Sequence, residues 1–189
     1  MKALMGVAIL SALCASPSAT ADCWAPVAGA GRIAFTARQA GAAFQGEFKS
    51  YAGQVCLAEG PASQNRIRVS VQTASVDSRL PELDEALRGP DFFDVQRWPQ
   101  AAFESETVNA IGKGRYEVTG KLTIRDITRG VAVPFTLTPQ GDGKTAKVEA
   151  RTTLLRLDYR VGSGQWADTR WVDNAVELVF SLTMQRVPE

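Results

Sequence analysis

Residues 116–124 read YEVTGKLTI and residues 131–137 read VAVPFTL. In each stretch, apolar residues or glycine occupy every second position, and mostly polar or small residues stand between them. This period of two is typical of half-buried β-strands in antiparallel sheets. The two stretches, separated by a break at Gly130, therefore predict an all-β fold.

The same alternation recurs through most of the chain. It is clearest in residues 33–38, 44–48, 55–57, 66–72 and 176–184. A meander of this length is expected to close into a barrel or to fold over as a sandwich, because open edges promote aggregation. No internal repeat, low-complexity tract or linker divides the chain, which favours one domain.

One segment breaks the strand pattern. Between Ser78 and Arg88, Leu80, Leu83 and Leu87 recur at helical spacing, and Gly89-Pro90 follows. This arrangement predicts a short helix that lies across one end of the sheet.

The first 21 residues have the composition of a secretory signal peptide. Lys2 gives a positive start, residues 3–15 are apolar or small, and Ala19-Thr20-Ala21 forms a small-x-small cleavage pattern. We therefore expect residues 1–21 to be removed and residues 22–189 to form the mature domain. The apolar run is too short for a membrane-spanning helix.

The cysteine count agrees with export. Cys14 would leave with the signal peptide, so that Cys23 and Cys56 remain. An even pair in an oxidising compartment predicts a disulfide that attaches the N-terminus to the third strand. The alternative is two unpaired thiols.

Composition excludes several classes of function. The chain contains 21 Lys and Arg, 20 Asp and Glu, and no His, for a formal charge of +1. Without His there is no Ser-His-Asp or Cys-His pair and no imidazole metal ligand. The balanced charge does not favour nucleic acid, and the carboxylates of Glu104 and Glu106 fall on a polar strand face. We expect a protein that is not an enzyme and holds no metal.

Residues 91–137 resemble the YceI-like family of exported, lipocalin-like proteins. The motifs that carry the resemblance are FFDV at 92–95, Trp98-Pro99, AFES at 102–105, VTGKLTI at 118–124 and DIT at 126–128. Further pieces agree at Gly46-Glu47-Phe48, at residues 74–77 and at residues 157–162. The match follows the expected order along nearly all of the mature chain.

The resemblance implies an eight-stranded antiparallel barrel, capped at one end by the helix, that holds a polyisoprenoid lipid such as an isoprenoid quinone. It also implies a periplasmic location, with a bound lipid but no covalent cofactor. The candidate lumen residues are Phe35, Phe48, Val118, Gly120, Leu122, Phe135, Leu137 and Phe180. Periodicity alone leaves a second interpretation open, in which these side chains form a solid core.

Four aromatic residues are candidates for the barrel mouth. Phe92, Phe93 and Trp98 follow the helix and would form either a lid or a permanent plug. The fourth is Trp166, which together with Trp171 flanks a glycine-rich loop, where both would face the mouth or a membrane surface, or simply anchor the loop.

Many relatives carry His at the positions of Gln39 and Arg125. Arg125, beside Asp126, is a candidate for contact with a ligand head group, and the alternative is a solvated turn. Residues 162–171 resemble a sub-branch that accompanies cytochrome b561-type membrane proteins. An alternative function is therefore an interaction module with a filled barrel that docks to such a partner, and a homodimer is a further expectation from the family.

Overall fold

The structure is a computed structural model that describes residues 21–58 and 65–188. The predicted signal peptide lies outside this part of the chain except for Ala21, and so does Cys14. No helix in the described residues has the length and apolar character needed to cross a membrane. The strands are β1 (Ala21–Gln39), β2 (Ala42–Phe48), β3 (Tyr51–Ala58), β4 (Arg66–Gln72), β5 (Val76–Asp77), β6 (Gln100–Gly112), β7 (Arg115–Ile124), β8 (Ile127–Gln140), β9 (Thr145–Leu155) and β10 (Ala175–Val187).

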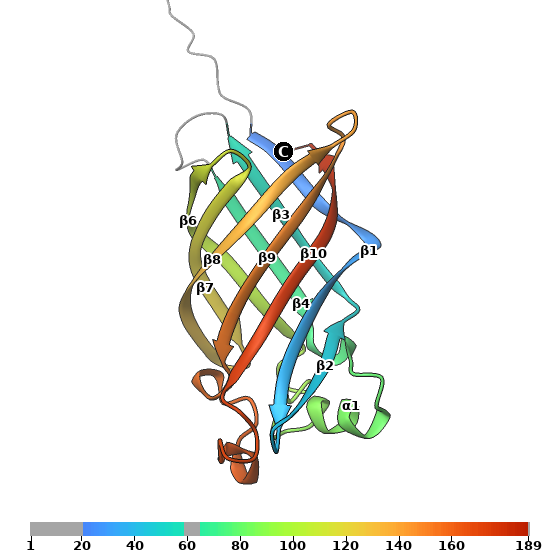
Figure 1. Cartoon of the computed structure of the whole chain (residues 1–189), viewed down its shortest axis with the longest axis vertical. Helices are drawn as coiled ribbons and strands as arrows, with labels where there is room; N and C mark the ends of the chain where they lie inside the picture. The colour runs from blue at the N-terminus through green and yellow to red at the C-terminus, as the bar shows by residue number, and fades with distance from the viewer. Residues whose placement is uncertain (1–20, 59–64, 189) are drawn as a thin grey trace, which may run out of the picture.

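The strands close into an eight-stranded antiparallel barrel, as predicted (Figure 1). The order around the barrel is β1-β10-β9-β8-β7-β6-β4-β3, and β3 pairs again with β1. β2 and β5 extend the wall at one end, where β2 pairs with the second half of β1. The alternation found in the sequence places one face of each strand inside the barrel.

β1 bends, and its two ends pair with different strands on the side that faces away from β10. Its residues 21–24 pair with β3 and its residues 33–39 pair with β2. The register against β10 shifts between Pro26 and Gly31. Gly31 has a φ of 154°, and a Cβ there would lie 2.6 Å from the carbonyl oxygen of Ser181. Glycine is therefore required where β1 returns to β10.

Two packed clusters close the ends of the barrel. At the end where β1 begins and β10 ends in Figure 1, the buried side chains include Trp24, Val108, Leu137, Ala146 and Met184. At the opposite end lie α1 (Pro81–Arg88) and the 3-10 turns η3 (Arg156–Tyr159) and η4 (Gly164–Ala167). There the buried residues are Phe35, Val76, Leu87, Phe92, Tyr159 and Val161.

The helix is shorter than predicted, because it begins at Pro81 instead of near Ser78. The backbone N–H of Ser78 and its hydroxyl both donate to Oδ1 of Asp84, at 2.7 and 2.6 Å, which holds Ser78 in a turn before the helix. Proline at the first helical position fits this start. Leu87 is buried, whereas Leu80 precedes the helix and is 57% exposed.

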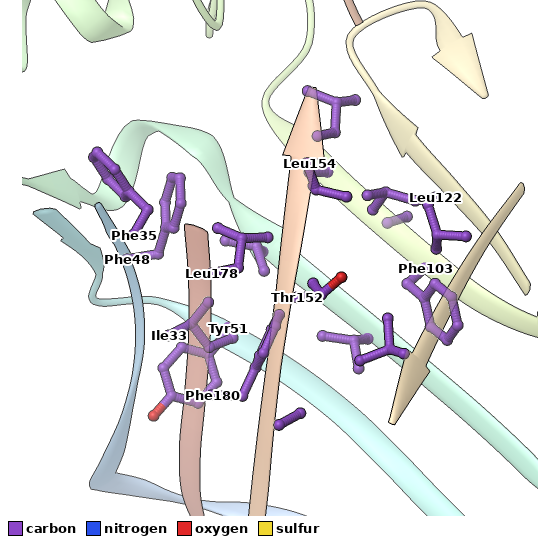
Figure 2. A pocket seen from close by; sticks show the side chains of 18 of the residues that line it. Ile33, Phe35, Phe48, Tyr51, Phe103, Leu122, Thr152, Leu154, Leu178 and Phe180 are labelled. Carbon is purple, nitrogen blue, oxygen red and sulfur yellow. The ribbon is translucent and has the colours of Figure 1, made fainter. Parts of the chain in front are cut away.

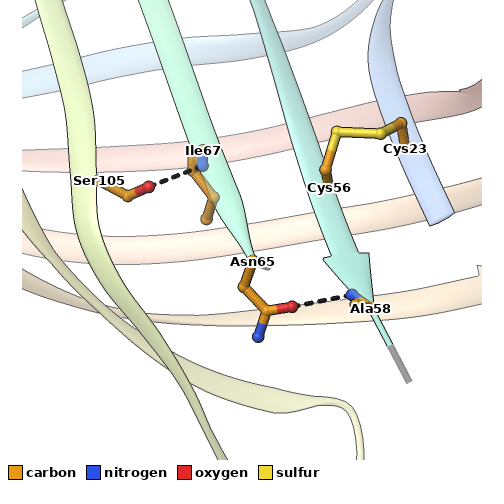
Figure 3. The surroundings of a disulfide bond; sticks show 6 residues. All are labelled: Cys23, Cys56, Ala58, Asn65, Ile67 and Ser105. Carbon is orange, nitrogen blue, oxygen red and sulfur yellow. Dashed lines mark hydrogen bonds between the residues drawn. A yellow bond between two sulfur atoms is a disulfide. The ribbon is translucent and has the colours of Figure 1, made fainter. Parts of the chain in front are cut away.

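The predicted disulfide is present. Cys23 on β1 and Cys56 on β3 are directly opposite in the ladder, and their side chains are joined (Figure 3). Beyond the bridge, Oδ1 of Asn65 accepts a hydrogen bond from the backbone N–H of Ala58 at 2.8 Å. The bridge therefore lies where β1 closes the barrel against β3.

Replacing Cys23 and Cys56 together by Ser should lower the free energy of unfolding by about 3–4 kcal/mol, because the unfolded chain would regain the freedom of a long loop. The two residues are 33 positions apart. Urea titration of the oxidised protein and the double variant measures the difference. Equal midpoints would contradict a stabilising role for the bridge.

Candidate ligand-binding cavity

A cavity of about 260 Å³ lies inside the barrel between the two packed ends. Its wall consists of inward-facing side chains from every strand of the barrel, and most of them are Val, Leu, Ile, Phe or Ala. Figure 2 shows part of this wall, with Leu178 and Phe180 from β10 and Leu154 from β9. The interior is therefore an apolar lumen and not a solid core along its full length.

Six of the eight predicted lumen residues line the cavity. They are Phe35, Phe48, Val118, Leu122, Phe135 and Phe180. Leu137 also faces inward, but it packs among the buried residues of the closed end, beyond the cavity. Periodicity predicts which face of a strand a residue occupies, but it does not tell how far along the barrel axis the lumen extends.

Gly120 is also outside the lining, and its role is different. A Cβ at this position would collide with the carbonyl oxygen of Glu104 and would lie 2.7 Å from Cζ of Phe103. The missing side chain therefore makes room for the Phe103 ring, which itself lines the cavity. The group that approaches Gly120 closely therefore belongs to the neighbouring strand β6 of the protein.

The sequence analysis missed several lining residues. Tyr51, Phe103, Thr152 and Leu154 all line the cavity (Figure 2). Phe103 lies in β6, whose register against β7 shifts between Ser105 and Thr107, and this shift interrupts the alternation. The hydroxyls of Tyr51 and Thr152 are among the few polar groups of the wall.

Aromatic rings form the part of the wall nearest to α1. Phe35 contacts Phe44 edge-to-face with 6.3 Å between ring centroids, and Phe48 lies 5.9 Å from Phe35. Phe93 contacts Phe48 at 5.6 Å. Such pairs add about 0.5–1.5 kcal/mol each beyond the area that they bury.

Of the four predicted mouth residues, two line the cavity. Phe92 and Phe93 close its end, and Trp166 packs on the outer side of this closure, with its ring 5.7 Å from that of Phe92. Trp98 is outside the lining and stacks between the guanidinium groups of Arg97 and Arg125, at 4.5 and 4.6 Å. We use the term lid for residues 89–98 together with residues 156–172.

A buried arginine that the sequence analysis missed holds the lid together. Arg156 is 6% exposed and lines the cavity. All five of its N–H groups donate to backbone carbonyl oxygens, which belong to Val161, Gly162, Trp166, Val172 and Asp173, at 2.7–2.9 Å. Burial lowers the pKa of its guanidinium below the usual value. No local pattern in the sequence distinguishes this Arg from an exposed one.

Gly162 is required beside Arg156. It has a φ of 77°, and a Cβ there would collide with Nη1 of Arg156. The glycine of the family-like LDYRVG motif is therefore explained by the space that the guanidinium occupies.

Arg125 contacts the lid and not the cavity. Its side chain is 10% exposed, and Nη1 donates to the carbonyl oxygens of Phe92 at 3.0 Å and Arg160 at 2.7 Å. Nη2 lies 4.0 Å from Oδ2 of Asp94. Arg125 thus joins the two segments of the lid and is not part of a solvated turn, and its contact with a ligand head group stays a prediction.

The remaining predicted residues lie at the periphery of this end. Gln39 forms an isolated β-bridge with Val172 of the lid. Trp171 is 62% exposed, in contrast to the half-buried Trp166. Only Trp171 therefore offers an exposed aromatic surface near the lid.

The ionisable groups of the cavity wall are few. The lining contains no Asp, Glu, Lys or Cys, and burial raises the pKa of Tyr51 and of Tyr159. Across residues 21–58 and 65–188, no group of three or more acidic, Cys or His side chains is placed to hold a metal ion. Glu104 and Glu106 form surface ion pairs with Arg68 at 2.6 Å and Lys121 at 3.2 Å.

A closed antiparallel barrel with one apolar lumen is the architecture of lipocalin-like binding barrels. The family model for a YceI-like domain matches residues 24–184, and the chain therefore belongs to the YceI-like family. It is 32% identical over 141 residues to protein YceI of Salmonella arizonae, which covers 72% of this chain and 71% of that protein.

Solved structures show the same fold. The crystal structure of BcnA from Burkholderia cenocepacia matches with a TM-score of 0.75 and 30% identity, over 81% of this chain and 95% of that chain. A polyisoprenoid binding domain from Saccharophagus degradans, implicated in plant cell wall breakdown, matches with a TM-score of 0.70 and 13% identity. That match covers 87% of this chain and 98% of the other.

Substituting Gly120→Ala should destabilise the protein by about 1–3 kcal/mol, because the added methyl overlaps Phe103 and the backbone of β6. Gly130→Ala is the control, since a Cβ there meets nothing within 4 Å. Chemical unfolding of both variants measures the two effects. Equal destabilisation would show that the packing around Gly120 is not tight.

Substituting Arg156→Lys should lower the free energy of unfolding by about 2–4 kcal/mol, because an ammonium has three donors and leaves buried carbonyls without partners. Amide hydrogen exchange should become faster in residues 161–173. Arg160→Lys is the control, because its side chain is 70% exposed and its partner Asp126 is 3.8 Å away. Unchanged exchange in Arg156→Lys would contradict the role of Arg156 in the lid.

Proposed function

We propose that the protein is a periplasmic, non-enzymatic carrier that holds a polyisoprenoid lipid, and specifically an isoprenoid quinone, in the barrel lumen. The observation that carries the proposal is the cavity of about 260 Å³, whose wall is almost entirely hydrocarbon and contains no carboxylate, amine or thiol. Such a wall offers burial to an apolar chain, and its polar groups are limited to one guanidinium, one amide and a few hydroxyls.

The size and shape of the lumen favour a slender ligand. An eight-stranded barrel leaves an interior wide enough for packed side chains or for one narrow molecule. Burying a ten-carbon stretch contributes roughly 8 kcal/mol before ordering costs are subtracted. The name of the Saccharophagus degradans domain, which states polyisoprenoid binding, supports this ligand class.

The disulfide supports a location outside the cytoplasm, because such bridges persist in oxidising compartments. The predicted signal peptide supports the same location. Within this proposal Phe35, Phe48 and Phe180 contact the chain of the ligand. Arg125 holds the lid, since its guanidinium contacts lid carbonyls and not the lumen.

The primary test is organic extraction of the protein purified from its native host, followed by mass spectrometry. We expect an isoprenoid quinone to be recovered in repeated preparations. Lipid-free preparations that also fail to take up added quinone would overturn the proposal.

A lumen-filling variant tests where the ligand binds. Leu178 lines the cavity, whereas the adjacent Val179 faces outward on the same strand. Leu178→Trp should weaken binding of decylubiquinone at least about tenfold, since an indole occupies space that the ligand needs. Val179→Trp should bind like the unmodified protein in the same fluorescence titration. Equal binding by both variants would place the ligand outside the lumen.

A further inference from the structure

The barrel wall is interrupted between β8 and β9. These strands pair only from Phe135 opposite Ala150 to Gln140 opposite Thr145. Residues 127–134 of β8 and residues 151–155 of β9 have no partner across this interface. On their other sides both segments are fully paired, with β7 and with β10. Figure 1 shows the two strands diverging from their shared hairpin.

The sequence of β8 accounts for the separation. Pro134 is the first residue beyond the last pair, and it has no N–H to donate to β9. Proline within a sheet is confined to edges of this kind. At the far end of the interruption, Nε of Arg129 contacts the carbonyl oxygen of Asp158 at 3.4 Å. The interruption in pairing is therefore bounded by the paired hairpin at one end and by the Arg129 contact at the other.

Both edges of the interruption contribute to the cavity wall. Val131 and Val133 on one edge and Thr152 and Leu154 on the other all line the cavity, and all four are half-buried. Ala150, Leu122 and Phe180, which lie in paired stretches of strand, also line the cavity and are half-buried, so this degree of burial reflects the cavity. Figure 2 shows Thr152 and Leu154 on the cavity side of β9, toward Leu122 and Phe103.

The two ends of the barrel are closed more firmly than the unpaired stretch between β8 and β9. One end is packed with side chains, among them Met184, which is 2% exposed. At the other end the lid is held by the five hydrogen bonds of Arg156 and the two of Arg125. A second unpaired stretch separates residues 25–32 of β1 from β3, and there Tyr51 stands beside Ile33 and Phe180 (Figure 2).

We propose that the opening between β8 and β9 is the portal through which an isoprenoid chain enters and leaves the lumen sideways. This inference rests on the proposed function. The edges of the portal present Val131, Val133 and Leu154 to the chain, and the lid stays closed during passage. Separating these edges breaks no backbone ladder, whereas opening the lid breaks hydrogen bonds to a buried guanidinium.

A crosslink across the portal tests this route. Ala132 and Thr153 are exposed, outward-facing residues that would be opposite each other if the ladder continued. The variant Ala132→Cys with Thr153→Cys is treated with a bismaleimide, and mass spectrometry verifies the bridge. The cysteines of the described residues are already joined to each other, so the introduced thiols are the reactive pair. Stopped-flow fluorescence then measures decylubiquinone uptake and release.

We expect the bridge to slow uptake and release by at least about tenfold each, with the dissociation constant changed less than about threefold. The control bridge joins Thr136→Cys and Glu149→Cys, which face each other in the paired half of the same strands and should leave both rates unchanged. Val133→Phe, which narrows the portal without a crosslink, should also slow both rates.

Unchanged rates in the bridged protein and in Val133→Phe would overturn the portal. The ligand would then enter through the lid or through the unpaired stretch beside Tyr51. If the proposed function itself is wrong, the unbridged double variant binds no quinone at all, and this result distinguishes the two failures. Equal slowing by the control bridge would also overturn the portal, since it would show a general effect of crosslinking.

Discussion

The pairing of β1 with both β10 and β3 is the constraint on which the rest of the structure depends. Because the barrel closes, no long strand edge is left at this point and the apolar faces of eight strands turn toward one axis. Closure needs the bend at Gly31 and is fixed covalently by Cys23 and Cys56. Without this one closure there would be no enclosed lumen.

The two ends of the barrel are closed in different ways. At the disulfide end, side chains such as Val108 and Met184 fill the interior and make a solid core. Toward α1 the inward residues leave space, and the closure consists of a lid held by Arg156. A core of full density along the whole axis would be more stable but would leave no room for a ligand. The separation of β8 from β9 adds access from the side.

Much of the fold could be predicted from the sequence, since strict alternation in residues 116–124 and 131–137 indicates half-buried strands. The disulfide was predicted from two cysteines in a chain expected to be exported, and the YceI-like motifs indicated the number of strands. The position of the lumen could not be predicted in full, because Leu137 and Phe135 share one face yet only Phe135 lines the cavity. Arg156 was missed because its five partners are backbone carbonyls, which carry no sequence signature.

The use of peptide oxygens as the acceptors of Arg156 has a consequence for the pH dependence of the lid. A lid held by carboxylates would loosen when these groups take up protons, whereas the acceptors of Arg156 are peptide oxygens that do not titrate near neutrality. Arg125 likewise donates to two peptide oxygens. Acidification would therefore leave these hydrogen bonds intact, whereas the contact of Arg125 with Asp94 at 4.0 Å is a lid attachment that involves a carboxylate. The part of the lid that Arg156 holds is thus fixed by groups whose charge state does not change with external acidity.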